Sequence, residues 1–470
     1  MFCIDELTLR ELGALLQRGR LTSVELVTHY LQRLDALNPT LNAVIQRPST
    51  ESLLEQARQA DAELRSERVR GPLHGIPLTI KDACHVRGFR MSRGVAELRG
   101  EPSEHDATAV ARLRAAGAIV LGISNVPEFC MAFETDNLLY GATRNPHDLQ
   151  RSPGGSSGGE AAAIAAGCSP AGLASDACGS IRIPAHFCGV CGLKPTQWRV
   201  PLTGQYPNER SGVFHMISTF GALGRYIDDV ALLGRLMAGG DGIDPDTVDV
   251  PWPDYRERSI AGMRVAICPT TPQSIPTPPV RRALESVAAQ LVDQVALVDM
   301  AMPPLLDQAF HTLWRAFVMG GDGGRGWRRL FDAIGKRDFS APLEELLAHS
   351  EGLESSVDML RADLNLMDDF RYQLAAFFRD YDALICPVYP DVAFAPGESL
   401  NDTSAYSYVF PFSLSGSPVV ALPVARHGNL PIALQIVGRH WDEAGILALA
   451  AHLERSLPRW EPASSTVYLY

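Results

Sequence analysis

Residues 152–185 read SPGGSSGGEAAAIAAGCSPAGLASDACGSIRIPA, and this stretch decides the fold. The glycine-rich run PGGSSGG leads into EAAAIAAG at 160–167, whose composition predicts a helix. AGLAS then predicts a strand of small residues, and DACGS a tight loop. Ser156 and Ser180 are 24 residues apart, a gap that a helix and a strand can span. We therefore expect both serines at the same edge of one sheet.

The same alternation of helices and strands extends over most of the chain. Apolar runs predict strands at about 76–80, 118–122, 264–268, 383–388 and 431–437. Periodic patterns predict helices at about 107–116, 228–237, 280–291, 355–379 and 442–454. This alternation favours an α/β fold: a large mixed, mostly twisted β-sheet covered by helices on both faces. We expect a single domain over 1–470, with a catalytic core at about 70–240 and a variable substrate-side region at about 300–410.

Composition argues against several classes of function. The chain has 470 residues, a formal net charge of −12 and no run of Lys or Arg, so we expect no nucleic-acid partner. Its N-terminus lacks the pattern of a signal peptide, and prolines and serines interrupt the longest uncharged stretch, so no membrane span is expected. The nine cysteines are odd in number and lie in apolar surroundings, which indicates buried thiols in a reducing cytoplasm rather than a metal site.

Lysine is scarce, with three lysines among 42 basic residues. Lys81 ends the apolar run GIPLTIK, where burial would lower its pKa; arginine in that place could not lose its proton. A neutral amine there could serve as the base that a weakly nucleophilic serine requires. Lys194, in GLKPT, is interpreted as a structural contact, and Lys336, in the polar context GKRDF, as a chance survivor.

Several segments together resemble the amidase signature family. They are GIPLTIKD (75–82), YGATRNPHDLQRSPGGSSGGEAAAIAAG (140–167), SDACGSIRIPAHFCGVCGLKPT (175–196), GALGRYIDDVALLGRLMAG (221–239) and LPIALQIVGRHWDE (430–443). The run FCGVCGLKPT is similar to the branch of fatty-acid amide hydrolase and stand-alone amidases. The resemblance implies a Ser–cis-Ser–Lys triad, with Lys81 as base, Ser156 as proton relay after a cis peptide bond and Ser180 as nucleophile. It implies no metal and no cofactor.

The loop before Ser180 could stabilise a tetrahedral intermediate. Candidate oxyanion donors are the backbone N–H groups of the loop, at Ala177, Cys178, Gly179 and Ser180. Asp176 and Arg182 flank this loop and are interpreted as its scaffold. The family usually has glycine in place of Cys178 and threonine in place of Ala177. Cys178 is therefore either a tolerated small residue, a determinant of acyl specificity or, least in keeping with the retained Ser180, an alternative nucleophile.

The resulting hypothesis is an amidase that forms an acyl-enzyme on a small or medium apolar or aryl amide, with possible esterase activity. Two alternatives stay open: the glutaminase subunit of a tRNA-dependent amidotransferase, and a catalytically impaired binding protein. The acyl pocket is expected from loops within 125–140, 198–216 and 305–410. Trp314, Trp327 and Phe331 either cover the site or, as we favour, belong to the core. By analogy, the protein could form a homodimer.

Overall fold

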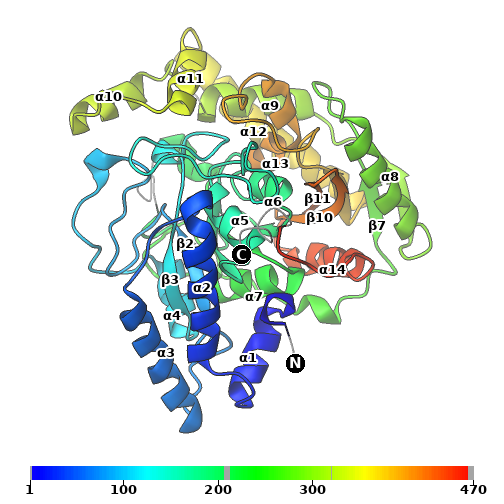
Figure 1. Cartoon of the computed structure of the whole chain (residues 1–470). Helices are drawn as coiled ribbons and strands as arrows, with labels where there is room; N and C mark the ends of the chain where they lie inside the picture. The colour runs from blue at the N-terminus through cyan, green and yellow to red at the C-terminus, as the bar shows by residue number, and fades with distance from the viewer. Residues whose placement is uncertain (1–2, 206–211, 319, 464–470) are drawn as a thin grey trace.

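The computed structural model describes residues 3–205, 212–318 and 320–463, and its centre is one eleven-stranded sheet (Figure 1). In spatial order the strands are β1 (Val44–Gln46), β3 (Ile119–Ser124), β2 (Pro77–Lys81), β4 (Ala171–Asp176), β6 (Thr219–Gly224), β5 (Cys191–Lys194), β10 (Val419–His427), β11 (Leu430–Gly438), β9 (Ala383–Pro387), β7 (Arg264–Ile267) and β8 (Leu297–Met300). Parallel pairs, such as β2 with β4, stand beside antiparallel pairs, such as β10 with β11. The predicted mixed sheet is confirmed.

Helices cover both faces of this sheet, as predicted. One face carries α5 (Gly158–Ala165) and α6 (Arg182–Cys188), and the opposite face carries α7 (Ile227–Met237) and α14 (Glu443–Glu454). The two faces are visible in the strand β5, where Gly192 abuts α6 and the next residue, Leu193, abuts α7. The other α-helices are α1 (Leu9–Gln17), α2 (Ser23–Leu41), α3 (Thr50–Arg65), α4 (Thr108–Ala115), α8 (Pro278–Leu291), α9 (Leu306–Thr312), α10 (Arg325–Ile334), α11 (Ala341–Ser350), α12 (Val357–Asp380) and α13 (Phe410–Leu414).

The small residues of the stretch 152–185, called the opening stretch below, allow helix and sheet to approach closely. Every residue of α5 is buried. A Cβ placed on Gly172, in β4, would collide with the carboxyl group of Glu160 in α5. The lack of a side chain at Gly172 therefore allows α5 to approach β4 closely.

The parallel strands β2 and β4 position the candidate site. Thr79 and Ile80 of β2 pair with Gly172 and Leu173 of β4, so the carboxyl ends of both strands meet at one edge. Lys81 ends β2, and Ser175 and Asp176 end β4. In the described part of the chain, none of the helices is both long enough and apolar enough to cross a membrane.

Candidate functional site

The side-chain nitrogen of Lys81 lies at the centre of the site. Its Nζ is 2.7 Å from Ser156 Oγ, 3.0 Å from Ser175 Oγ and 3.2 Å from the carbonyl oxygen of Ser175. The side chain is 1% exposed, and this burial lowers the pKa of Lys81 below its usual value, although nearby acidic groups oppose the shift. The structure therefore places a lysine with a depressed pKa in direct contact with a serine hydroxyl.

Ser156 faces this lysine because of the local backbone. The peptide bond between Gly155 and Ser156 is cis, as the family resemblance implied. The helix α5 begins after Ser157, so the N-cap position belongs to Ser157 and leaves the Ser156 hydroxyl to the lysine. A Cβ at Gly158 would collide with Thr135, which explains why glycine follows the two serines.

Ser180 reaches the same place from the other end of the opening stretch. Its carbonyl oxygen accepts a hydrogen bond from the N–H of Ser157 at 3.2 Å, which ties the loop after β4 to the turn before α5. Ser156, Ser175 and Ser180 all line one cavity. The two serines that the sequence singled out therefore share one cavity.

Asp176 and Arg182 form a buried ion pair that organises the loop between them. Asp176 accepts from the backbone N–H groups of Gly179 at 2.8 Å and Ile181 at 3.0 Å, and from Arg182 Nε and Nη2, each at 3.0 Å. Burial alone would raise the pKa of Asp176, but the Arg182 guanidinium holds it well below its usual range. Gly179 has a φ of 103°, a conformation that favours glycine, so the tight loop depends on this residue.

The cavity in front of the serines is small and apolar. Its volume is about 60 Å³, and its walls have three parts: residues 129–133; Ser156 with the 175–180 loop and Phe214; and the segment that carries Val318, Trp327 and Leu346. Phe214 and the first and third of these parts lie within the three ranges expected from the sequence. None of the described lining residues carries a charged side chain.

The three aromatic residues that the sequence left ambiguous have different places. Trp327 lines the cavity, contrary to the preferred interpretation that it belongs to the core. Phe331 lies 4.9 Å, ring centre to ring centre, from Phe129 in a small buried cluster, and Trp314 packs at the border of the main core. Only Trp327 of the three therefore contacts the described cavity.

Two cysteines also line the cavity. Cys178 is buried, and burial raises the pKa of its thiol. Burial also raises the pKa of the Cys130 thiol, which lies near Lys81 and Ser156. Because a thiol reacts as its thiolate, these raised values give no support to a cysteine nucleophile. All nine cysteines are free, and seven of them are buried as predicted, whereas Cys3 is exposed and Cys130 is partly buried.

The other two lysines are also buried, one of them against expectation. Lys194 Nζ donates to the carbonyl oxygen of Ser417 at 2.8 Å, in line with its predicted structural role. Burial and the neighbouring Arg182 lower the pKa of Lys194 to about 7. Lys336 is 3% exposed, and its Nζ lies 2.7 Å from Glu128 Oε1. This ion pair contradicts the interpretation of Lys336 as a chance survivor.

Sequence reasoning also missed Ser175. Two of the three oxygen atoms around Lys81 Nζ belong to this residue. Its position directly before Asp176, at the end of a predicted strand, was the available signal. Among the described residues, no group of three or more metal-ligating side chains could hold a metal ion.

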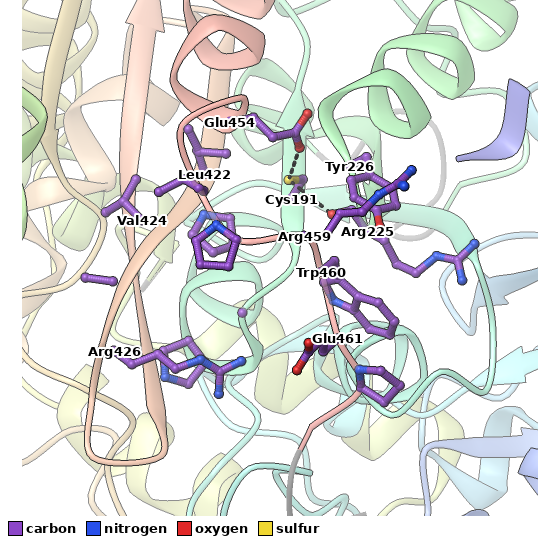
Figure 2. Close-up of a pocket in the computed structure, with 17 residues that line it drawn as sticks. Cys191, Arg225, Tyr226, Leu422, Val424, Arg426, Glu454, Arg459, Trp460 and Glu461 are labelled. Atoms are coloured by element: carbon purple, nitrogen blue, oxygen red, sulfur yellow. Dashed lines mark hydrogen bonds between the residues drawn. The ribbon is translucent and has the colours of Figure 1, made fainter. Parts of the chain in front are cut away.

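A larger cavity of about 440 Å³ lies elsewhere, between the β10–β11 hairpin and the end of α14. Figure 2 shows Cys191 and Glu454 on one side of it and Trp460 on another, and Cys191 Sγ donates to Glu454 Oε1 at 3.7 Å. No serine or lysine is among its described lining residues, so it lacks the combination that defines the first cavity.

Comparisons with known proteins identify the family to which the chain is similar. A family model described as Amidase matches residues 25–447. The chain is 34% identical, over 97% of both proteins, to a glutamyl-tRNA(Gln) amidotransferase subunit from Roseiflexus sp. (strain RS-1). It is 33% identical, over 98% of both, to an acylamidase from Rhodococcus erythropolis. The structure of a fatty acid amide hydrolase superimposes with a TM-score of 0.86 at 23% identity, over 96% of this chain and 85% of that one, and so supports the fold alone.

Proposed function

Because the chain belongs to the amidase family, we propose that it hydrolyses a carboxamide C–N bond through an acyl-enzyme on Ser180. The observation that carries this proposal is the 2.7 Å contact between Lys81 Nζ and Ser156 Oγ inside the cavity that Ser180 also lines. A buried amine, a relay hydroxyl and a second hydroxyl are the groups that such a reaction requires.

The contacts of Lys81 suit a neutral amine that acts as the base. A neutral amine has two N–H groups, which the two oxygen atoms of Ser175 can accept, and one lone pair, which can accept the Ser156 proton. Ser180 Oγ then attacks the amide carbon while its proton passes to Ser156, and the Ser156 proton passes to Lys81. Burial supports this role because it disfavours the charged form of the lysine.

The same protons return when the C–N bond breaks. The tetrahedral intermediate collapses, the proton on Lys81 moves back through Ser156 to the departing nitrogen, and the amine leaves as a neutral molecule. Water then attacks the ester on Ser180 with the same relay as base, which releases the carboxylic acid. No step requires a metal or cofactor.

We assign the oxyanion contact to the 177–180 loop. The Gly179 N–H donates to Asp176 Oδ1, so this donor is shared with the scaffold of the loop. Ala177, Cys178 and Ser180 supply the other candidate N–H groups. Each oxyanion donor contributes about 2.7–4 kcal/mol where substitution has removed it in other hydrolases.

The apolar cavity supports an amide with an apolar or aryl acyl group. Glutamine carries an ammonium and a carboxylate, and burying either without a charged partner is costly. The described cavity walls offer hydroxyl, thiol and apolar groups but no charged side chain. The free thiols fit a cytoplasmic enzyme that acts on a small-molecule amide, and esters with the same acyl group are expected side substrates.

The name of the Roseiflexus relative supports a second candidate, a glutaminase subunit of an amidotransferase. That candidate predicts that the chain purifies with partner proteins and hydrolyses glutamine only in their presence. The uncharged cavity favours the stand-alone amidase.

Covalent labelling tests the proposal. A small alkyl fluorophosphonate should add once to the protein, and peptide mapping should place the adduct on Ser180. Ser180→Ala should abolish labelling. Ser157→Ala, which changes the serine next to Ser156, is the control and should still be labelled. An unmodified protein mass after prolonged labelling, together with no hydrolysis of simple anilides, would refute the assignment.

A further inference from the structure

We propose that residues 322–354 form a cover that limits the size of the acyl group, and that the buried Lys336–Glu128 ion pair is the latch that holds this cover closed. The cover contains α10 and α11, which Figure 1 shows at the periphery of the molecule, beside α9 and α12. The inference deepens the proposed amide hydrolysis, on which its kinetic test rests.

The cover leaves and rejoins the protein at one place. Asp322 and Glu354 pair through an isolated β-bridge, and the N–H of Ser355 donates to the carbonyl oxygen of Gly321 at 2.9 Å. Positive φ angles of 66–75° occur at four glycines beside this base, Gly320, Gly321, Gly323 and Gly324. Glycine tolerates such conformations and changes between them, so the base can act as a hinge.

The latch lies at the far end of the cover from this base. Glu128 Oε1 is 2.7 Å from Lys336 Nζ, and Glu128 Oε2 accepts from the N–H of Ser340 at 2.7 Å. Lys336 is 3% and Glu128 1% exposed. Both carboxylate oxygens of Glu128 therefore bind the cover, and the next residue, Phe129, belongs to the cavity wall.

Apart from the latch, apolar contacts in a separate cluster hold the cover down. Phe331, Leu343 and Leu347 pack there with Val95 and Phe129, and partly buried apolar residues of the cover join them, namely Trp327, Leu330, Ile334 and Phe339. Leu346 does reach the main core. Because a small cluster stabilises less than a large one, the cover can open without disrupting the sheet.

The inner face of the cover closes the acyl side of the cavity. Trp327 from α10 and Leu346 from α11 line the cavity that the serines also line. The enclosed volume of about 60 Å³ is far below the 300–1,000 Å³ typical of ligand pockets. A short acyl group fits beneath the closed cover, whereas a longer one must displace Trp327 or lift the cover against the latch.

The kinetic test compares acetanilide with N-phenylhexanamide, which have the same leaving amine. Trp327→Ala should raise the ratio of kcat/KM for the hexanoyl over the acetyl substrate by about tenfold or more, since each methylene accommodated in an apolar pocket contributes substantially. Lys336→Met should raise the same ratio, through a lower KM for the longer substrate. Arg337→Met, which removes an exposed cation paired with Asp332, is the matched control and should leave the ratio unchanged.

A second variant replaces Lys336→Met if that variant misfolds, and a second measurement follows binding without catalysis. If Lys336→Met does not fold because Glu128 is left unpaired, the double variant Glu128→Gln with Lys336→Met removes both charges and takes its place. Calorimetric binding of both anilides to Ser180→Ala, with and without Trp327→Ala, measures the size limit without catalysis. If no variant hydrolyses either anilide but the relative affinity for the two anilides still depends on Trp327, the proposed function is refuted and the cover stands. If the kcat/KM ratio and the relative affinity for the two anilides are unchanged in all variants, the cover is refuted.

Discussion

The ion pair between Asp176 and Arg182 leads to a quantitative prediction. Asp176 accepts five hydrogen bonds, two from the Arg182 side chain and three from the backbone N–H groups of Gly179, Ile181 and Arg182. Both side chains are fully buried. Asp176→Asn removes the charge and turns one acceptor into a donor, so Arg182 keeps its charge with neutral acceptors only: the remaining carboxamide oxygen, the Val409 carbonyl and the Ser413 hydroxyl.

Breaking one side of a buried pair in this way typically costs about 3–5 kcal/mol. We expect a loss of this size in the free energy of unfolding, measured by urea denaturation at pH 7. Because the same bonds orient the 177–180 loop, kcat should also fall by about 100-fold or more. Asp332→Asn is the control, since its pair with Arg337 is exposed and such pairs contribute about 0–1 kcal/mol.

The pH dependence follows from the lowered pKa of Asp176. Its contribution to stability is complete above the unfolded-state pKa of 3.8 and is lost as the pH falls through the lower folded-state pKa. The difference between Asp176→Asn and the unmodified protein should therefore be constant from pH 7 down to about 5 and shrink in stronger acid. If the free energy of unfolding of Asp176→Asn is within about 1 kcal/mol of that of Asp332→Asn, the organising role of the ion pair is refuted.

Three further predictions concern the lysines and their partners. Lys81→Met should lower kcat/KM by about 10²–10⁴-fold. In the unmodified enzyme, kcat/KM should rise with pH through a lysine pKa below 10.5. If the variant keeps the same pH profile, Lys81 is not the base. Ser175→Ala removes one of the oxygen atoms around Lys81 Nζ and should lower kcat by about 5- to 10-fold, with KM unchanged. The folded-state pKa of Lys194, about 7, lies below its unfolded value of 10.5, so the unfolded state binds more protons between these pH values. The free energy of unfolding should therefore rise with pH across this window. Lys194→Met should abolish that rise, measured by urea denaturation at about pH 7 to 10.

The local pattern of the opening stretch was sufficient to predict how the site is built. Small residues permit close packing of α5 on β4, and the spacing of Ser156 and Ser180 then brings them to one cavity. The end of β2 could be recognised because a mostly apolar run, in which Thr79 is polar, precedes Lys81. In these cases the relevant contacts follow from short segments, so periodicity and turn residues carry the information.

Contacts between residues far apart in the sequence were harder to predict. The partner of Lys336 is 208 positions away in the sequence, and the local context GKRDF is polar, so local pattern suggested a solvent-exposed residue. Trp327 and Phe331 are four residues apart on α10 and pack in the same small cluster, yet only Trp327 also lines the cavity. The separation of these roles depends on how the cover docks, which tertiary packing decides rather than helical periodicity.

The three lysines show how the surroundings of one side chain type decide its role. All are buried, and an argument from scarcity would have applied to each of them. Lys81 is surrounded by hydroxyl and carbonyl oxygens, and burial lowers its pKa, which suits a base. Lys336 instead faces the carboxylate of Glu128, and a buried charge pair of this kind holds two segments together. Arginine could not replace Lys81, because its permanent charge excludes the role of a base. In a chain whose other basic residues are arginines, the three lysines are therefore all buried, and each contacts a different set of acceptors.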